Sequence, residues 1–218
     1  MGEKPVIDDS LRPAAAKSNQ YTLFTRTFCN NSFRKGQTMS TQFPGVHSVQ
    51  VYDEDADLIG VLGNTVATSL ALGDSALIIA TPEHHQQLTK ELTALRIDLA
   101  VCEREGRYVA LDAREVINAV MRNGLPDREL FETQFGAAMD AARSNARNLK
   151  RGLTVYGECV ALLWLDGNKE AALRLEQLFE EVYGSDYTFH VHCGYPRSLF
   201  ANASEIVKVE QLHSHVLQ

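Results

Sequence analysis

The part of the sequence from residue 47 to residue 200 alternates short apolar runs with longer amphipathic segments. SALIIAT, residues 75–81, is continuously apolar and of strand length, which is typical of a strand buried on both faces of a parallel sheet. The segment before it carries apolar residues at every fourth position, as one face of a helix does: Leu58, Leu62, Val66 and Leu70. This alternation predicts an α/β fold, with a mostly parallel central sheet and helices on both faces.

The same patterns place the other elements along the chain. Further strands are expected at residues 47–52, 107–113, 153–158 and 187–196. Helices are expected from Thr81-Pro82 onward and at residues 113–124, 127–148, 168–184 and 204–216. Residues 1–44 are polar and aperiodic, so we expect a flexible N-terminal arm followed by a single α/β domain at 45–218.

Composition excludes several classes of protein. The formal net charge of −7 argues against a surface that binds nucleic acid directly. No apolar run approaches the roughly 20 residues that a membrane-spanning helix needs, and the N-terminus lacks the apolar stretch of a signal peptide. Four scattered cysteines without a C-x-x-C pair suit a reducing compartment. These features predict a cytoplasmic protein that does not contact membranes.

Nucleotide-binding motifs are absent from the sequence. A phosphate-binding loop of the G-x-x-x-x-G-K-[ST] type requires a Gly-Lys pair, and the chain has none. The first strand-to-helix turn reads YDEDAD, whose acids would repel a phosphate. G-x-G-x-x-G is missing as well. We therefore expect neither a conventional NTPase nor a dinucleotide-dependent dehydrogenase, and no cofactor.

Histidine and cysteine residues raise the possibility of metal binding or covalent catalysis. His190 and His192 share one face of a strand while Cys193 points to the other, so no set of four converging ligands is visible. Histidines with satisfied hydrogen bonds are the favoured interpretation, and His213 and His215 on the expected last helix are interpreted as solvated. No local signature of a nucleophilic enzyme surrounds Cys159 or Cys193. The sequence predicts no metal site and no catalytic residue.

Ligands of parallel α/β sheets bind outside the carboxyl ends of the strands. Tyr52 and Asp53, Glu158, and Cys193 to Tyr195 lie at such ends. Glu158 follows a glycine and precedes an apolar helix, so it either faces a ligand cleft or stabilises the first turn of that helix. The ligand interpretation is favoured, because Gly157 would let a ligand approach the backbone.

Several segments together resemble the MEDS domain, the methanogen/methylotroph sensory domain. They are His47 and Tyr52 followed by acids, then LALGDSALIIATPEH, GRYVALDA, YGECVALLW and CGYP, in that order over about residues 45–200. The resemblance implies a RecA/KaiC-like core that has lost its phosphate loop, a role in prokaryotic signal transduction, and sensing of small hydrocarbon derivatives. It also implies a site made of His47, Tyr52, Glu158, Cys193 and Tyr195, to which Asp53 is added by its place at the strand end.

Three functions are compatible with these observations. The leading prediction is a stand-alone sensory module that is not an enzyme, binds a small molecule and acts through a signalling partner such as a histidine kinase or regulator. The alternatives are a protein-interaction or scaffold module with a degenerate ligand site, and a small-molecule enzyme using Glu158 and His47 as acid–base groups. A deep pocket containing His47 and Glu158 would favour the first or the third, and a filled strand edge with a large exposed apolar patch the second.

Overall fold

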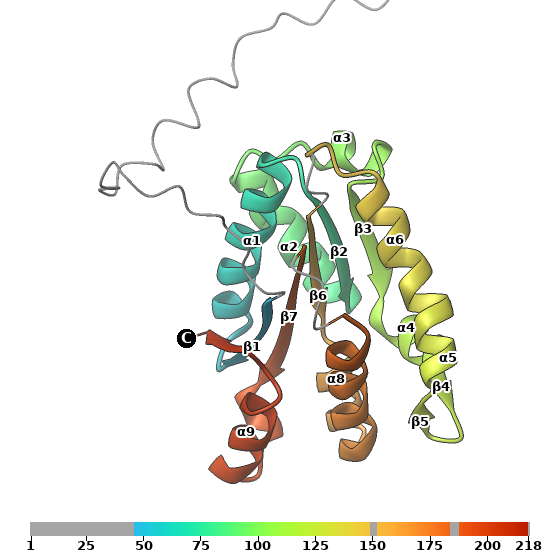
Figure 1. Ribbon diagram of the computed structural model, residues 1–218. Coiled ribbons are helices and arrows are strands. Elements are labelled where there is room, and N and C mark those ends of the chain that lie inside the picture. Colours follow the sequence, from blue (N-terminus) through green and yellow to red (C-terminus); the bar gives the residue numbers. More distant parts are fainter. Residues whose placement is uncertain (1–45, 149–151, 184–187, 218) are drawn as a thin grey trace, which may run out of the picture. The chain divides into compact units, whose positions relative to one another are not determined.

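The computed structural model describes residues 46–148, 152–183 and 188–217 of the chain. The predicted arm, residues 1–44, lies outside the described residues. Six parallel strands form the central sheet in the order β3-β2-β6-β7-β1-β8, which confirms the predicted α/β fold (Figure 1). Their bounds are β1 Val46–Tyr52, β2 Ser75–Ala80, β3 Tyr108–Asp112, β6 Leu153–Gly157, β7 Phe189–Pro196 and β8 His215–Leu217.

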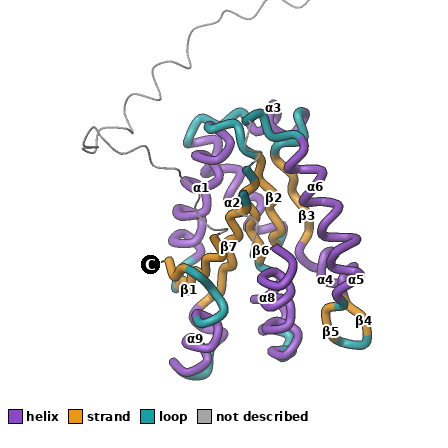
Figure 2. The backbone as a smooth tube through the Cα atoms, viewed as in Figure 1, coloured by secondary structure: helices purple, strands orange, loops and turns teal. Residues whose placement is uncertain are grey.

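Helices cover both faces of the sheet and divide the core into two apolar layers (Figures 1 and 2). The first layer, called here the α1 face, is packed by α1 Asp55–Ala71, α2 Pro82–Ala94 and α3 Leu99–Arg104. The second, called the α8 face, is packed by α4 Ala113–Val120, α6 Gly136–Ser144, α7 Cys159–Leu165, α8 Lys169–Tyr183 and α9 Ala203–Glu210. No helix in these ranges is both long and apolar enough to span a bilayer.

Local sequence signals set several helix ends, and the start of α2 at Thr81-Pro82 is as predicted. The side chain of Thr81 caps α2 by accepting a hydrogen bond from the N–H of His84, and Pro82 occupies the first helical position. Asp112 caps α4 in the same way. Gly73, two residues after α1, has φ = +85°, a conformation that only glycine adopts readily.

Three predicted helices differ from the structure. The one expected at 113–124 ends at Val120, because Asn123-Gly124 forms a turn with both φ values positive between the short strands β4 Met121–Arg122 and β5 Leu125–Pro126. The helix expected at 127–148 is interrupted by a π-helical turn: α5 Arg128–Leu130, η2 Phe131–Phe135, α6. The expected last helix stops at Glu210, and β8 then pairs with β1.

The connections between strands place two topological switch points at the carboxyl edge of the sheet. β2 leads to α2 on the α1 face, whereas its neighbour β6 leads to α7 on the α8 face. β1 and β7 likewise lead to opposite faces, through α1 and α9. A crevice opens where neighbouring strands connect to opposite faces, and ligands of such sheets bind there.

Candidate functional site

The six residues predicted as a ligand site lie in separate places. Successive strand residues point to opposite faces, so His47 and Tyr52, five positions apart on β1, face opposite layers. His47, Cys193 and Tyr195 lie together on the α8 face. Tyr52 lies on the α1 face, close to Glu158 at the carboxyl edge of the sheet. Asp53 is exposed and forms an ion pair with Arg197.

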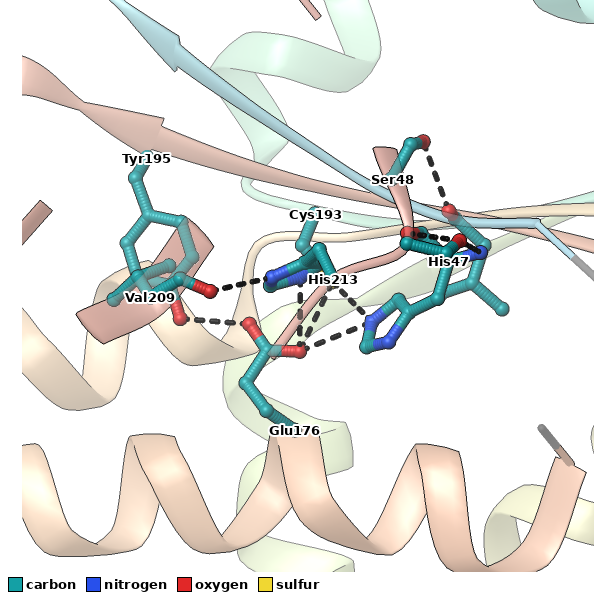
Figure 3. A network of polar contacts seen from close by, with 9 residues as sticks. His47, Ser48, Glu176, Cys193, Tyr195, Val209 and His213 are labelled. Carbon is teal, nitrogen blue, oxygen red and sulfur yellow. Dashed lines mark hydrogen bonds and ion pairs between the residues drawn. The ribbon is translucent and has the colours of Figure 1, made fainter. Parts of the chain in front are cut away.

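A buried cluster of polar side chains surrounds Glu176 on the α8 face (Figure 3). Oε2 of Glu176 lies 3.2 Å from Nε2 of His47, 3.4 Å from Nε2 of His213 and 3.4 Å from the sulfur of Cys193. The Tyr195 hydroxyl donates a hydrogen bond of 2.7 Å to Oε1. We call these five residues the Glu176 cluster. It joins β1, β7, α8 and the segment after α9.

Charge in this cluster follows from burial and mutual contact. Burial by itself would raise the pKa of Glu176, but His213 and His47 hold the pKa well below its usual range. Burial would lower the pKa of His213. The facing carboxylate of Glu176 more than offsets this, so the pKa of His213 is raised above its ordinary value. Glu176 and His213 thus face each other in the core, and each favours the charged form of the other.

A second group of polar side chains, called here the edge cluster, lies at the switch point between β2 and β6. Glu158, only 3% exposed, accepts a hydrogen bond of 2.6 Å from the backbone N–H of Thr81. Its other oxygen lies 2.6 Å from Nδ1 of His84 and accepts a hydrogen bond of 3.2 Å from the hydroxyl of Tyr156. Nε2 of His84 in turn lies 3.4 Å from Asp55. Glu158 thus ties the end of β6 to the start of α2.

Tyr52 and Gly194 adjoin the edge cluster. Burial, Glu158 and Asp55 all raise the pKa of Tyr52, so its hydroxyl remains protonated beside the carboxylates. A Cβ at Gly194 would lie 2.9 Å from the hydroxyl of Tyr156, so this glycine makes room for the ring that reaches Glu158. The structure therefore brings Tyr52 close to Glu158, as predicted, but places Cys193 and Tyr195 elsewhere.

A small apolar cavity lies under β6 on the α8 face. Gly157 belongs to that face by strand alternation, between Ile79 and Cys193 on the neighbouring strands, and it contributes no side chain there. A Cβ built on Gly157 would meet no atom within 4 Å. The resulting Gly157 cavity has a volume of about 20 Å³, and its lining comes from the sheet and from α4, η2, α7 and α8: Ile79, Val116, Val120, Phe131, Phe135, Gly157, Cys159, Val160, Leu175, Phe179, Val191 and Cys193.

Comparison with known proteins identifies the family. The family model described as MEDS, "MEthanogen/methylotroph, DcmR Sensory domain", matches residues 46–214. The chain belongs to the MEDS family. The match confirms the predicted resemblance and supports a sensory role in signal transduction. Neither the curated proteins nor the solved structures provide a match to this MEDS chain.

The sequence did not predict several residues of these sites: Glu176, His84, Tyr156, Asp55 and His213. Glu176 carries the clearest missed signal, since it lies between Ala172 and Phe179 on the buried face of an otherwise amphipathic helix. His84 lies in the first turn of α2, three residues after the cap Thr81, and its side chain reaches Glu158 at the end of β6. Asp55 in α1 and His213 carry no comparable pattern, because their partners lie on other elements.

Two interpretations of histidines need correction. His213 is not solvated: its side chain has no exposed surface and it faces Glu176, because the helix ends early and the chain turns back over β1. His215 is exposed, as predicted. His192 does not have a satisfied hydrogen bond, since neither ring nitrogen has a partner among the described residues of this MEDS domain. Burial lowers its pKa to about 3, so the ring is neutral.

Histidine 84 makes the stability of the MEDS domain depend on pH. Its pKa is raised above the ordinary value, first by the hydrogen bond to Glu158 and, against the effect of burial, by the charges of Glu158 and Asp55. A raised pKa stabilises the fold below the ordinary value of about 6.5 and loses that contribution as pH rises through the folded-state pKa. We expect His84→Gln to cost more stability at pH 6 than at pH 9, measured by urea unfolding; an equal loss at both pH values would contradict this.

Proposed function

We propose that this MEDS domain senses a small, weakly polar hydrocarbon derivative that enters the Gly157 cavity, and that it transmits binding to a signalling protein without catalysing a reaction. The observation that carries the proposal is the cavity itself, an apolar space in the core created by a missing side chain in the middle of the sheet. Interior packing of proteins rarely leaves such a space next to a strand.

The lining of the cavity suits an apolar occupant. Its exposed inner surface is entirely apolar, and the thiols of Cys159 and Cys193 are its weakly polar groups. Apolar cavities of this kind stay dry and accept small apolar molecules such as benzene or xenon when large enough. One- or two-carbon halocarbons and alcohols match this chemistry better than sugars, nucleotides or amino acids, which need several charged or hydrogen-bonding partners.

Binding requires the cavity to expand. About 20 Å³ holds little more than one water-sized group, so a ligand of three or four heavy atoms must displace part of the wall. Phe131 and Phe135 belong to η2, a π-helical turn, and such turns occur frequently at functional sites. We infer that the ligand displaces η2, and that this displacement shifts the adjoining α6 and the β4–β5 hairpin. The surface that a partner contacts would change as a result.

The edge cluster is the second candidate for the ligand site. It contains Glu158 and adjoins Tyr52, both from the sequence-based prediction, and it lies at a switch point of the sheet, where ligands of such folds bind. However, Glu158 already accepts hydrogen bonds from Thr81, His84 and Tyr156, so a ligand there must replace existing partners. We therefore assign the edge cluster a different role: Glu158 follows Gly157 directly and couples the cavity wall to α2.

Filling the cavity tests the proposal. Gly157→Ala adds one methyl group where no atom lies within 4 Å, so the fold should tolerate it while the space for a ligand disappears. We expect dichloromethane, methanol or a related compound at about 100 times its Kd to raise the Tm of the wild type by roughly 5–10 °C. The same compound should leave the Tm of Gly157→Ala unchanged.

Gly60→Ala is the matched control, because a Cβ at Gly60 on α1 also meets nothing within 4 Å and lies away from the cavity. This variant should keep the full ligand-induced shift. A shift that survives in Gly157→Ala but disappears in Glu158→Gln would move the site to the edge cluster. Absence of any shift with compounds of this class would reject the proposed function.

A further inference from the structure

We propose that the Glu176 cluster is a closed, four-coordinate zinc site, with His47, Glu176, Cys193 and His213 as its ligands. One ligand atom from each of these side chains lies within 4.8 Å of all the others. Their types, two imidazoles, a thiol and a carboxylate, are those that bind zinc in proteins. The inference does not depend on the ligand proposed for the Gly157 cavity.

Distances between the ligand atoms agree with a tetrahedron around one ion. Zinc bonds of about 2.0–2.3 Å place the corners of a tetrahedron about 3.3–3.6 Å apart. Oε2 of Glu176 lies 3.2 Å from Nε2 of His47, 3.4 Å from Nε2 of His213 and 3.4 Å from the sulfur of Cys193. That sulfur lies 3.5 Å from Nε2 of His47. The His213 ligand atom lies within 4.8 Å of those of His47 and Cys193, so the four side chains enclose an ion after local adjustment.

Neighbouring groups orient the ligands as they do in metal sites (Figure 3). Nδ1 of His213 lies 2.8 Å from the carbonyl oxygen of Val209, which fixes the tautomer that leaves Nε2 free to bind a metal. The hydroxyl of Tyr195 donates to Oε1 of Glu176 and leaves Oε2 for the ion. Nδ1 of His47 has no such partner among the described residues.

Two nitrogens of the cluster lack a hydrogen bond in the part of the chain that the structure describes, Nδ1 of His47 and Nε2 of His213. The side chain of His213 has no exposed surface, and its Nε2, although 3.4 Å from Glu176, makes no hydrogen bond within the described ranges. A buried polar atom without a partner is costly, and native structures rarely retain one without a reason. Because the His213 ligand atom lies within 4.8 Å of those of the other three residues, a metal ion bound by them would satisfy it.

Charge also favours a divalent ion at this place. The two imidazoles bind a metal as neutral ligands, whereas the carboxylate and the thiolate bring one negative charge each. Zn²⁺ would therefore make the site neutral overall, which suits side chains that are almost completely buried. The thiol proton of Cys193 would leave to solvent on binding.

Metal analysis of the purified full chain tests the site directly. We expect about one zinc ion per chain after exhaustive dialysis. Reconstitution of the chelator-treated protein with Co²⁺ should produce the intense visible bands of a tetrahedral site and a thiolate-to-cobalt charge-transfer band. Cys193→Ser should abolish the charge-transfer band, and His213→Gln should weaken metal retention by at least about tenfold.

Cys102→Ser is the matched control. Cys102 is also buried, but it lies on the α1 face against Arg107, so its replacement should leave zinc content and the cobalt spectrum unchanged. A wild-type protein that folds, by circular dichroism, yet holds no zinc and takes up no Co²⁺ would overturn the proposal without reference to any variant. A thiolate-to-cobalt charge-transfer band that persists in Cys193→Ser would overturn it as well. So would stoichiometric iron or copper in place of zinc.

Discussion

Replacing Glu176 with alanine is expected to lower the free energy of unfolding by about 3–5 kcal/mol. The carboxylate is fully buried and contacts His47, His213, Cys193 and Tyr195. Its removal leaves the two imidazoles and the tyrosine hydroxyl without their common partner in the core, and breaking a buried ion pair costs more than losing an ordinary contact. Urea denaturation followed by circular dichroism measures the effect.

Two further variants separate the charge of Glu176 from its packing. Glu176→Gln keeps the shape of the side chain and one oxygen that accepts from Tyr195, but it removes the charge that faces His213. Most of the loss in the free energy of unfolding should therefore remain in this variant. Gln177→Ala, on the exposed side of the same helix, should change stability by less than about 0.5 kcal/mol. A loss below about 1 kcal/mol in Glu176→Ala would mean that the cluster is solvated in solution.

The parallel sheet could be predicted because local signals and long-range packing agree. SALIIAT is apolar throughout, and the structure buries all six residues of β2. Thr81-Pro82 gives the start of α2, because a threonine cap followed by a proline at the first helical position is a local signal. The tail was predicted wrongly as helix to residue 216 because β8 has only three residues, two of them exposed, and its strand conformation depends on pairing with β1.

The candidate sites could be predicted only in part, because sequence spacing does not reveal which face a residue shares with a distant element. His47 and Cys193 were singled out, but Glu176, the residue that joins them, was assigned to an ordinary amphipathic helix. The match of the family model to residues 46–214 could not correct this, since it names a family and not a geometry. The RecA-like part of the predicted fold likewise stays a prediction.

The second large effect is expected for Phe131→Ala. Phe131 is 1% exposed, stacks on Phe135 with ring centroids 5.1 Å apart and meets Phe179 edge-on at the same distance. Truncating a buried phenylalanine costs about 3–5 kcal/mol, because apolar contacts are lost and a cavity remains. Here the new space adjoins the Gly157 cavity, which Phe131 lines. We expect the variant to unfold at a lower urea concentration than the wild type and to bind benzene.

Benzene distinguishes an enlarged cavity from general loosening of the core. An apolar cavity that can hold benzene gains stability from it, so saturating benzene should raise the Tm of Phe131→Ala but not that of the wild type. Phe200→Ala is the control: Phe200 packs against Trp164 and Tyr195 away from the cavity, so its loss should lower the Tm without creating a benzene response. If benzene stabilises both variants equally, the space beside Gly157 has no special capacity for a ligand, because any truncated aromatic side chain would then create an equivalent site.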